Sequence, residues 1–507
     1  MKTFTAEQIR RWDQFTISQE SIPSLKLMER AALTLVGWIT ENCKNYNKVT
    51  VFCGHGNNGG DGFAAARILY TKGFDVEVIV PDLHAEFSED ASVNLQRLKD
   101  FSGISVVEFK ETAEYTFDEE TVVVDALFGT GLSRPLEGIY KKLIARLNEA
   151  GGLKISVDIP SGISADEFFE AETTVFKADY TLSFQSWKKS FLHPETGKYT
   201  GKVIILDIGL SQEYLEQEES EYYVIDEELI RTIFRPREEF SHKGTYGKAV
   251  IIGGSYGKMG AAVLATRSAL RTGAGLTFTQ APGCGYDILQ TSCPEAMFIK
   301  AGNEYIENIT AEEDGVYGIG TGIGTHEKTE KALLNFLKSL TQPVVLDADA
   351  LNIISKEKKN LKPIPEKSVI TPHPKEFERL FGSTDNSFER LELARKKAQE
   401  LNLYIVLKDH HTQVVTPEGK VFYNITGNAG LAKGGSGDIL TGILTSLLAQ
   451  KYSPEETCLL GVWLHGKAAD AAAEKYSKEA MLPTDVINKL GNVFGKLNKK
   501  RKTSNPE

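Results

Sequence analysis

Hydrophobic residues are grouped along this chain in short β-branched runs, and these alternate with longer segments whose apolar positions recur at helical spacing. In the first half, the short runs predict strands at 49–53, 76–80, 121–125, 154–158 and 202–206. Helical spacing predicts helices at 6–17, 25–38 and 63–70. Strands and helices that alternate in this way favour a parallel sheet with helices on both faces, so we expect an α/β domain.

An acidic, polar stretch, SQEYLEQEES at 211–220, interrupts this alternation before it begins again. Beyond it, apolar runs predict strands at 249–252, 315–319, 344–347, 369–371 and 404–408, and a long helix begins near Asp438. One core rarely exceeds about 300 residues. The 507 residues therefore predict two domains, at 1–215 and 225–495, with a linker at 216–224 and a basic tail at 496–507.

Composition narrows the class of protein. Apolar residues make up 41% of the chain and charged residues 25%, which is typical of a globular protein in water. The formal net charge of −11 argues against a nucleic-acid partner, which a basic surface would have to attract. It does not argue against nucleotide ligands, because backbone amides at a helix N-terminus bind phosphate without any net positive charge.

The cysteines and the apolar runs bear on location. Five cysteines without CxxC spacing predict neither a disulfide framework nor a zinc site. This usage favours a reducing compartment, and we expect the cytoplasm. The first residues, MKTFTAEQIRRWDQ, carry charges where a signal peptide needs an apolar run, and no run of about 18 apolar residues predicts a membrane span.

A glycine-rich segment, GHGNNGGDG at 54–62, follows the first predicted strand. Glycines there permit positive φ and close backbone approach, and amides at the start of the next helix suit a phosphate. Gly54, Gly56 and Gly59 match GxGxxG, but a tight strand–helix turn is an alternative for this match alone. A dinucleotide-binding fold usually carries an acid at the end of its second strand. Asp82 is the only candidate for that acid here, and it follows a proline, so a plain dehydrogenase is not favoured.

Two further loops carry carboxylates at the ends of predicted strands. Asp125 leads into ALFGTGLSRP, and Asp158 leads into IPSG. Ligands of open α/β sheets bind beyond the carboxyl ends of the strands, so we expect these loops to meet the glycine segment in one crevice. There Asn58, Asp125 and Ser161 can present oxygen atoms to a hard cation. A helix cap is the alternative for Asp125, and a turn serine for Ser161.

The strongest motif of the second half is GNAGLAKGGSGD at 427–438. Four small residues precede Asp438 at the start of an apolar helix, where bunched amides form an anion hole for a transferring phosphoryl group. A carboxylate at that position can take the proton of an attacking hydroxyl. The alternative is that Asp438 merely caps the helix. The pattern GxxxxGK[ST] is missing from the sequence, so a P-loop kinase is not supported.

Residues 1–215 resemble the NAD(P)H-hydrate epimerase family through NNGGDG, DALFGTGL and DIPSG. The resemblance implies a Rossmann-like three-layer fold, a K⁺ ion bound by Asn58, Asp125 and Ser161, and contact of Asp158 with the reacting nicotinamide ring. It also implies that Asp158 is catalytic and shuttles a proton as the C6 hydroxyl leaves and returns. The residues implied to hold the hydrate are Asn57, Asn58, Gly59, Gly60, Asp61, Gly129, Thr130, Gly131, Leu132, Ser133, Arg134, Pro135 and Asp158.

Residues 225–495 resemble the ADP-dependent NAD(P)H-hydrate dehydratases of the ribokinase-like superfamily through SHKGTYGKAVIIGGS, TPHPKEF, LKDHHT and GNAGLAKGGSGD. The resemblance implies Mg²⁺, with Glu376 similar to an acid that helps to hold it, and a hydrate contacted by Ala261, Gly322, His373 and Asp438. It implies an adenine nucleotide contacted by Lys408, Asp409, His410, His411, Thr412 and Gly437. Asp409 stands where the family usually has glycine, and we expect its carboxylate to point away from phosphate.

Together the resemblances imply a bifunctional repair enzyme. It would epimerise the R- and S-hydrates of NADH and NADPH, and dehydrate the S-hydrate with ADP to give NAD(P)H, AMP and phosphate. Asp438 would activate the C6 hydroxyl for attack on the β-phosphate of ADP. The family often assembles, so a homo-oligomer is expected. Two alternatives stay open, namely a vitamin- or sugar-kinase-like phosphotransferase with a binding-only first half, and a non-catalytic interaction protein.

Overall fold

The computed structural model describes residues 1–111, 117–169 and 173–501, which form two compact units. One unit spans Lys2–Ser220, and the other comprises Glu221–Glu507 together with Met1. The division falls inside the predicted linker, but that segment has regular structure, because helix α7 (Gln212–Gln217) ends in it and strand β9 (Tyr222–Ile225) begins in it. Helix α17 (Pro483–Arg501) likewise continues into the predicted tail, whose last six residues lie outside the described ones.

The N-terminal unit is built on a seven-stranded sheet with the order β4-β3-β2-β5-β6-β7-β8, and its neighbouring strands are parallel. Strand β5 is buried along its whole length, as expected of a central parallel strand covered on both faces. The strands are β2 (Lys48–Cys53), β3 (Asp75–Val80), β4 (Ser105–Glu108), β5 (Thr121–Ala126), β6 (Leu153–Val157), β7 (Tyr180–Phe184) and β8 (Lys202–Leu206).

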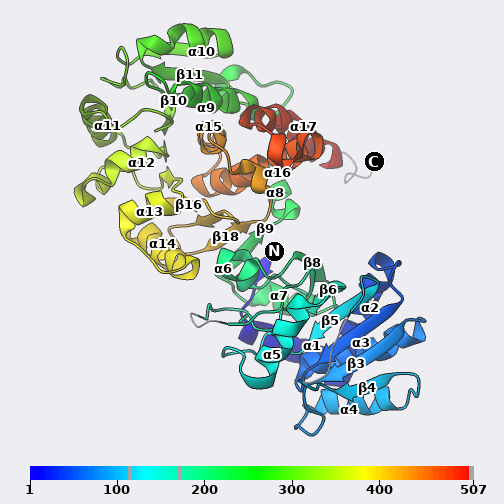
Figure 1. Ribbon diagram of the computed structural model, residues 1–507. Coiled ribbons are helices and arrows are strands. Elements are labelled where there is room, and N and C mark those ends of the chain that lie inside the picture. Colours follow the sequence, from blue (N-terminus) through cyan, green and yellow to red (C-terminus); the bar gives the residue numbers. More distant parts are fainter. Residues whose placement is uncertain (112–116, 170–172, 502–507) are drawn as a thin grey trace. The chain divides into compact units, whose positions relative to one another are not determined.

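Helices cover both faces of this sheet (Figure 1). One core joins Val51 and Val124 of the sheet to helices α2 (Ser24–Asn42), α3 (Asn57–Thr71) and α4 (Glu89–Lys99). The other core joins the alternate strand positions Phe52 and Val123 to helix α5 (Gly138–Glu149). Because successive side chains of a strand point to opposite faces, the two clusters define a three-layer α/β/α unit. Helix α1 (Ala6–Glu20) packs in a separate cluster with Tyr214 of α7.

The C-terminal unit carries a longer mixed sheet, in which its strands follow the order β9-β18-β17-β16-β15-β14-β13-β10-β11-β12. Neighbouring strands from β12 to β16 are parallel, whereas β17 is antiparallel to both β16 and β18. The strands are β10 (Lys248–Ile252), β11 (Leu276–Ala281), β12 (Met297–Lys300), β13 (Gly315–Ile319), β14 (Val345–Leu346), β15 (Val369–Ile370), β16 (Tyr404–Leu407), β17 (Gln413–Val415) and β18 (Val421–Asn424).

One apolar core of this unit lies between the sheet and three C-terminal helices. Strand residues such as Val345 and Val406 pack there against Ile443, Leu460 and Leu490, which belong to helices α15 (Ser436–Ala449), α16 (Pro454–Ala480) and α17. Figure 1 shows α11 (Glu327–Ser339), α12 (Asp349–Ile354), α13 (Pro374–Phe381) and α14 (Ser387–Leu401) on the side of the sheet away from these helices. Helix α9 (Met259–Thr272) packs against α15.

The α/β class predicted for both halves is confirmed, and every strand that the apolar runs predict is present within one or two residues at each end. The sheets also contain strands that the apolar runs did not predict, among them β4, β7, β9, β11, β12, β17 and β18. Among the described residues, no helix combines the length with the apolar character that a membrane span requires.

Candidate active sites

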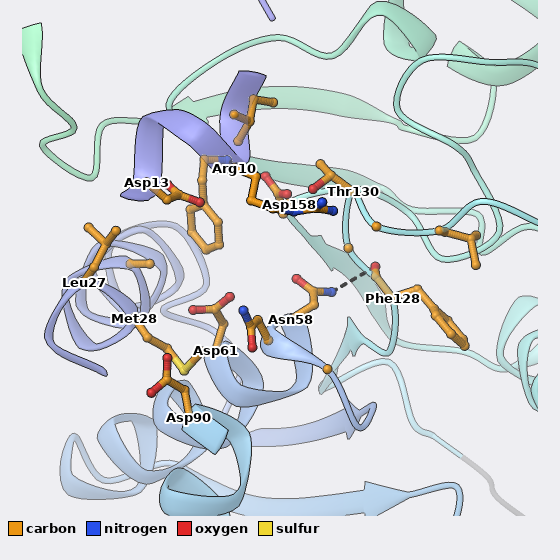
Figure 2. A pocket seen from close by; sticks show the side chains of 18 of the residues that line it. Arg10, Asp13, Leu27, Met28, Asn58, Asp61, Asp90, Phe128, Thr130 and Asp158 are labelled. Atoms are coloured by element: carbon orange, nitrogen blue, oxygen red, sulfur yellow. Dashed lines mark hydrogen bonds between the residues drawn. The ribbon is translucent and has the colours of Figure 1, made fainter. Parts of the chain in front are cut away.

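A pocket of about 600 Å³ opens at the carboxyl edge of the N-terminal sheet (Figure 2). Its walls come from α1, α2 and α3 and from the segments that follow β5, β6, β7 and β8. Of the residues predicted to hold the hydrate, those that line it are Asn57, Asn58, Asp61, Gly129, Thr130, Gly131, Leu132, Ser133, Arg134 and Asp158. Gly59, Gly60 and Pro135 are not among its lining residues.

The glycine segment is more helical than predicted. Helix α3 begins at Asn57, not near Phe63, so NNGGDG forms its first two turns. Gly54, Gly56 and Gly59 do not have positive φ, so this freedom of glycine is not used at these positions. Two of these glycines are required because neighbouring backbone lies too close for a side chain. A Cβ added to Gly54 would lie 1.9 Å from Leu127 O, and a Cβ added to Gly59 would lie 1.9 Å from Gly54 O.

Asp158 occupies a strained position at the end of β6. Its φ of 63° lies in the left-handed region, which costs a non-glycine residue free energy and is most often seen at functional sites. Its Oδ1 accepts hydrogen bonds from the Lys188 ammonium at 2.6 Å and from the Phe184 amide at 3.0 Å. Lys188 is fully buried, so the Asp158 carboxylate is the counter-charge that this ammonium needs.

The three residues predicted to bind K⁺ form one chain of hydrogen bonds. Asn58 Nδ2 donates to Phe128 O at 3.0 Å, and Phe128 N donates to Ser161 Oγ at 3.0 Å. Ser161 Oγ in turn donates to Asp125 Oδ1 at 2.6 Å. Asp125 is fully buried, and among the described residues it has hydrogen-bond donors but no ion-pair partner. Burial raises the pKa of Asp125 to about 6, although these donors lower it.

Helix α1, which no predicted motif included, contributes charged residues to the pocket. Arg10 and Asp13 lie one helical turn apart and both line the pocket (Figure 2). Asp13 has no hydrogen-bond or ion-pair partner among the described residues, and Figure 2 shows it in the pocket with Asp61 and Asp158. Amphipathic spacing revealed the helix, but only packing reveals that its acid faces a pocket built by distant loops.

In the C-terminal unit, helix α15 begins directly after Gly435, whose φ of 100° is accessible to glycine. The Ser436 amide is bonded to Lys433 O, so it is not available to an anion as the motif predicted. The amides of Gly437 and Asp438 have no acceptor among the described residues. They form the positive end of a 14-residue helix, which favours phosphate.

Asp438 lies in the first turn of α15 and is half-buried. No side chain caps this helix, and within the described part of the chain the Asp438 carboxylate has no hydrogen-bond donor. It is therefore not a structural cap. Burial and the charge of Asp347 raise the pKa of Asp438 to about 6, with an opposing contribution from Lys408 and a smaller increase from Asp349. A carboxyl with that pKa is a base at neutral pH.

Asp347 was missed as a functional candidate and organises this cluster. It follows β14, is almost fully buried, and accepts from Lys408 Nζ at 2.7 Å and from Thr441 Oγ1 at 2.8 Å. A Cβ on Gly437 would lie 3.4 Å from both Asp347 Oδ2 and Lys408 Nζ, which places the Lys408 ammonium beside the start of α15. The signal for Asp347 was the acid at a strand end, the same signal that identified Asp125 and Asp158.

The other predicted hydrate contacts are Ala261, Gly322 and His373. A Cβ on Gly322 would lie 3.0 Å from the Cβ of Ala261, so these two residues are neighbours. His373 caps helix α13 through Nδ1, with Glu376 bonded in return to the His373 amide at 2.9 Å. Glu376 also lies 3.8 Å from Lys408 Nζ, so the cap ties His373 to the Lys408 region.

The Asp409 carboxylate forms an ion pair with the side chain of Arg390. Its Oδ2 accepts from Arg390 of α14 at 2.8 Å, and its Oδ1 accepts from the His410 amide at 2.8 Å. The neighbouring His410 and His411 rings meet edge to face, with centroids 4.6 Å apart. Burial lowers the pKa of His411 to about 4, so this ring is neutral at physiological pH. Thr412 accepts the Asn424 amide through its carbonyl.

These observations define an α/β protein of two units. One unit has an acid-rich pocket, and the other has a helix N-terminus that suits phosphate and lies beside a carboxylate. The family models agree with the division, since residues 24–190 match the YjeF-related protein N-terminus and residues 249–492 match NAD(P)H-hydrate dehydratase. Relatives named bifunctional NAD(P)H-hydrate repair enzymes are 32% identical in *Moorella thermoacetica* (99% of this chain, 98% of the relative) and in *Escherichia coli* K12 (96% and 93%).

The chain belongs to the family of bifunctional NAD(P)H-hydrate repair enzymes. A solved ADP/ATP-dependent NAD(P)H-hydrate dehydratase from *Bacillus subtilis* is 31% identical, with a TM-score of 0.49 over 54% of this chain and 98% of that chain. A solved ribokinase-like superfamily protein from *Enterococcus faecalis* V583 is 28% identical, with a TM-score of 0.48 over 55% and 98%. Family membership does not favour a vitamin-kinase-like phosphotransferase, nor a non-catalytic interaction protein.

Proposed function

We propose that the N-terminal unit epimerises the R- and S-hydrates of NADH and NADPH at C6, and that the C-terminal unit dehydrates the S-hydrate at the expense of ADP. The products are NAD(P)H, AMP and phosphate. One polypeptide then repairs both epimers, because the first reaction supplies the epimer that the second consumes. Family membership supports this pairing.

The observation that carries the dehydratase proposal is the position of the Asp438 carboxylate beside the amides of Gly437 and Asp438, none of which has a hydrogen-bond partner within the described part of the chain. Asp438 takes the proton of the C6 hydroxyl as that oxygen attacks the β-phosphorus of ADP and AMP leaves. The amides of Gly437 and Asp438 and the ammonium of Lys408 stabilise the charge on the transferring group. The ring-nitrogen lone pair then expels phosphate from C6, and loss of a ring proton restores the reduced nicotinamide.

Residues from three loops would surround these substrates. Ala261, Gly322 and His373 would contact the hydrate, and the segment 408–412 would contact the nucleotide. The Asp409 carboxylate is compatible with this role because Arg390 neutralises it. Among the described residues no group of three His, Cys, Asp or Glu side chains could hold a metal. With ADP bound, Glu376 would help to hold Mg²⁺, which would neutralise charge on the phosphate oxygens.

The donor set at Asn58, Asp125 and Ser161 fits K⁺, since it offers amide, carboxylate and hydroxyl oxygens around a buried acid that forms no ion pair with any residue the structure describes. The ion would supply the missing counter-charge and fix the segment that follows β5 against α3. Replacing K⁺ by Li⁺ tests this assignment, because the epimerisation rate should fall and recover when K⁺ is restored. A rate that is the same in both salts would contradict it.

The deciding experiment incubates the purified protein with both hydrate epimers, ADP and Mg²⁺, and follows the absorbance of the reduced nicotinamide. Full recovery from both epimers is expected, with AMP and phosphate formed in equal amounts. ATP in place of ADP tests the choice of donor. Accumulation of a stable phosphorylated product without reduced cofactor would overturn the proposal.

Cellular location and assembly are also proposals. The five cysteines are all unpaired, and four of them are buried, which supports a reducing compartment such as the cytoplasm. We also expect a homo-oligomer, which light scattering after size-exclusion chromatography tests directly.

A further inference from the structure

Four acids from different elements line the N-terminal pocket: Asp13 of α1, Asp61 of α3, Asp90 of α4, and Asp158 after β6 (Figure 2). Epimerisation needs a group that gives a proton to the departing C6 oxygen and takes one back when water returns. These carboxyl groups differ in their surroundings, and the contrast between Asp13, Asp61 and Asp158 decides which of those three can exchange a proton.

Asp158 is held in a fixed ion pair. Lys188 Nζ lies 2.6 Å from Asp158 Oδ1, and this ammonium also donates to Ser183 Oγ at 2.7 Å and to Phe184 O at 3.0 Å. Because Lys188 is fully buried, protonation of Asp158 would leave the ammonium without its counter-charge. Asp158 is therefore suited to bind and orient the ring as a carboxylate, and poorly suited to carry a proton back and forth.

Asp13 has the opposite environment. No hydrogen bond or ion pair to its carboxyl group is formed by the described residues, and it lines the pocket. Burial and the negative charge of Asp158 raise the pKa of Asp13 to about 7, against a lowering contribution from Lys188. Near neutral pH such a carboxyl group exists in both protonation states, which is the requirement for acid–base catalysis.

Asp61 is a less suitable candidate. It is surrounded by Asp158, Asp13 and Asp90, and burial together with these charges raises the pKa of Asp61 well above its usual range. Burial and these neighbouring charges disfavour the carboxylate form of Asp61, so it is less suited than Asp13 to act as a base.

We propose that Asp13 is the acid–base residue of the epimerase unit, with Asp158 as the fixed carboxylate that orients the ring. This inference rests on the proposed epimerase function. The Asp13 carboxyl gives its proton to the C6 oxygen, the ring-nitrogen lone pair forms a C=N bond, and the C6–O bond breaks to release water. Water then adds to the opposite face of C6, the C=N electron pair returns to nitrogen, and the Asp13 carboxylate accepts a proton from that water.

The first test measures each epimer separately in the intact protein. With ADP and Mg²⁺ present, Asp13→Asn should slow the conversion of R-hydrate by about 100-fold or more, while the conversion of S-hydrate stays at the wild-type rate. Asp13→Glu keeps a carboxyl group and should retain a substantial part of the R-hydrate rate. Glu7→Gln makes the same chemical change as Asp13→Asn on the exposed part of α1, outside the pocket, and should leave both rates unchanged.

A pH profile separates catalysis from a structural role. The charged groups that face Asp13 are Arg10 of its own helix and Asp61, Asp90, Asp158 and Lys188 of other elements. Because expulsion needs the protonated form, the wild-type rate for R-hydrate should fall as the pH rises through about 7. The residual rate of Asp13→Asn should lack this decline. A decline of the same shape in the variant would overturn the proposal.

Labelled water tests the bond that breaks. Expulsion and return of water exchange the C6 oxygen, so epimerisation in H₂¹⁸O should place ¹⁸O in the hydrate at the rate of epimerisation. Epimerisation without label would instead indicate opening of the ring at the C6–N bond and would overturn the role of Asp13. A wild-type protein that converts no R-hydrate at all would instead refute the epimerase function itself.

Discussion

At the scale of single residues, both sites depend on carboxyl groups whose charge is either matched or left unmatched by the fold. Asp158 and Asp347 each face a buried or half-buried lysine. Asp13 and Asp438 line reactive positions without a hydrogen-bonding partner among the described residues. Matched acids hold other groups in place, whereas unmatched acids have raised pKa values and can exchange protons.

Asp438→Asn should abolish dehydration and leave ADP binding intact, because the amides and Lys408 remain. With wild-type protein, the rate of S-hydrate conversion should fall as the pH drops through about 6, since the carboxylate is the active form. Single-turnover rates and calorimetric ADP binding measure these effects. A variant with a near-wild-type rate would refute the assigned role.

The same substitution should stabilise the protein. The folded state binds the Asp438 proton more tightly than the unfolded chain does, so ionisation of this group costs folding free energy above pH 6. Asp438→Asn should therefore raise the free energy of unfolding by roughly 1–3 kcal/mol at pH 8. The gain should vanish below about pH 4, where the carboxyl is protonated in both states. Denaturant titrations at the two pH values provide the comparison.

Arg390 should protect the nucleotide segment from the charge of Asp409. Arg390→Ala removes the cation 2.8 Å from Asp409, and the freed carboxylate should raise the KM for ADP by about tenfold, or roughly 1.4 kcal/mol. Adding Asp409→Asn to this variant should restore most of the affinity. An Arg390→Ala protein with an unchanged KM would show that Asp409 lies too far from the nucleotide to matter.

At the scale of elements, the start of α3 is fixed by the space around its glycines. A Cβ on Gly59 would lie 1.9 Å from Gly54 O, which is backbone and cannot rotate away. Gly59→Ala should therefore lower the free energy of unfolding by about 1–3 kcal/mol, the usual cost of overpacking. Gly56→Ala is the matched control, since nothing lies within 4 Å of its added Cβ. Equal thermal melting shifts for the two variants would contradict this account.

The boundaries of elements show where local pattern was insufficient. NNGGDG was predicted to precede the helix, but it forms the start of α3, because the close contact of α3 with β2 and β5 outweighs the low helix preference of glycine. The acidic segment 216–224 was predicted to be a linker from its polarity. Strand β9 nevertheless begins there, because its backbone pairs with β18, some 200 residues later in the chain.

At the scale of the whole molecule, each unit contains its own site within its own fold. We therefore expect the two reactions to be separable by mutation. Asp158→Asn should block only epimerisation, and Asp438→Asn only dehydration. An equimolar mixture of the two variants should repair R-hydrate, because S-hydrate diffuses from one protein to the other. Failure of the mixture, with each variant retaining its remaining activity, would indicate that the hydrate does not exchange between molecules.

The order of elements, the α/β class and the chemistry of the motifs were determined by the sequence alone. These properties depend on the spacing of apolar residues and of motif residues that are close to one another in the chain. Asp438 lies next to the Gly437 amide in any helix that begins there. Only the tertiary structure decided that Asp13 reaches the pocket, that Asp347 holds Lys408, and that Asp409 turns to Arg390. Those contacts join residues from separate elements, and their distances depend on how helices and loops pack around a sheet, which no local pattern encodes.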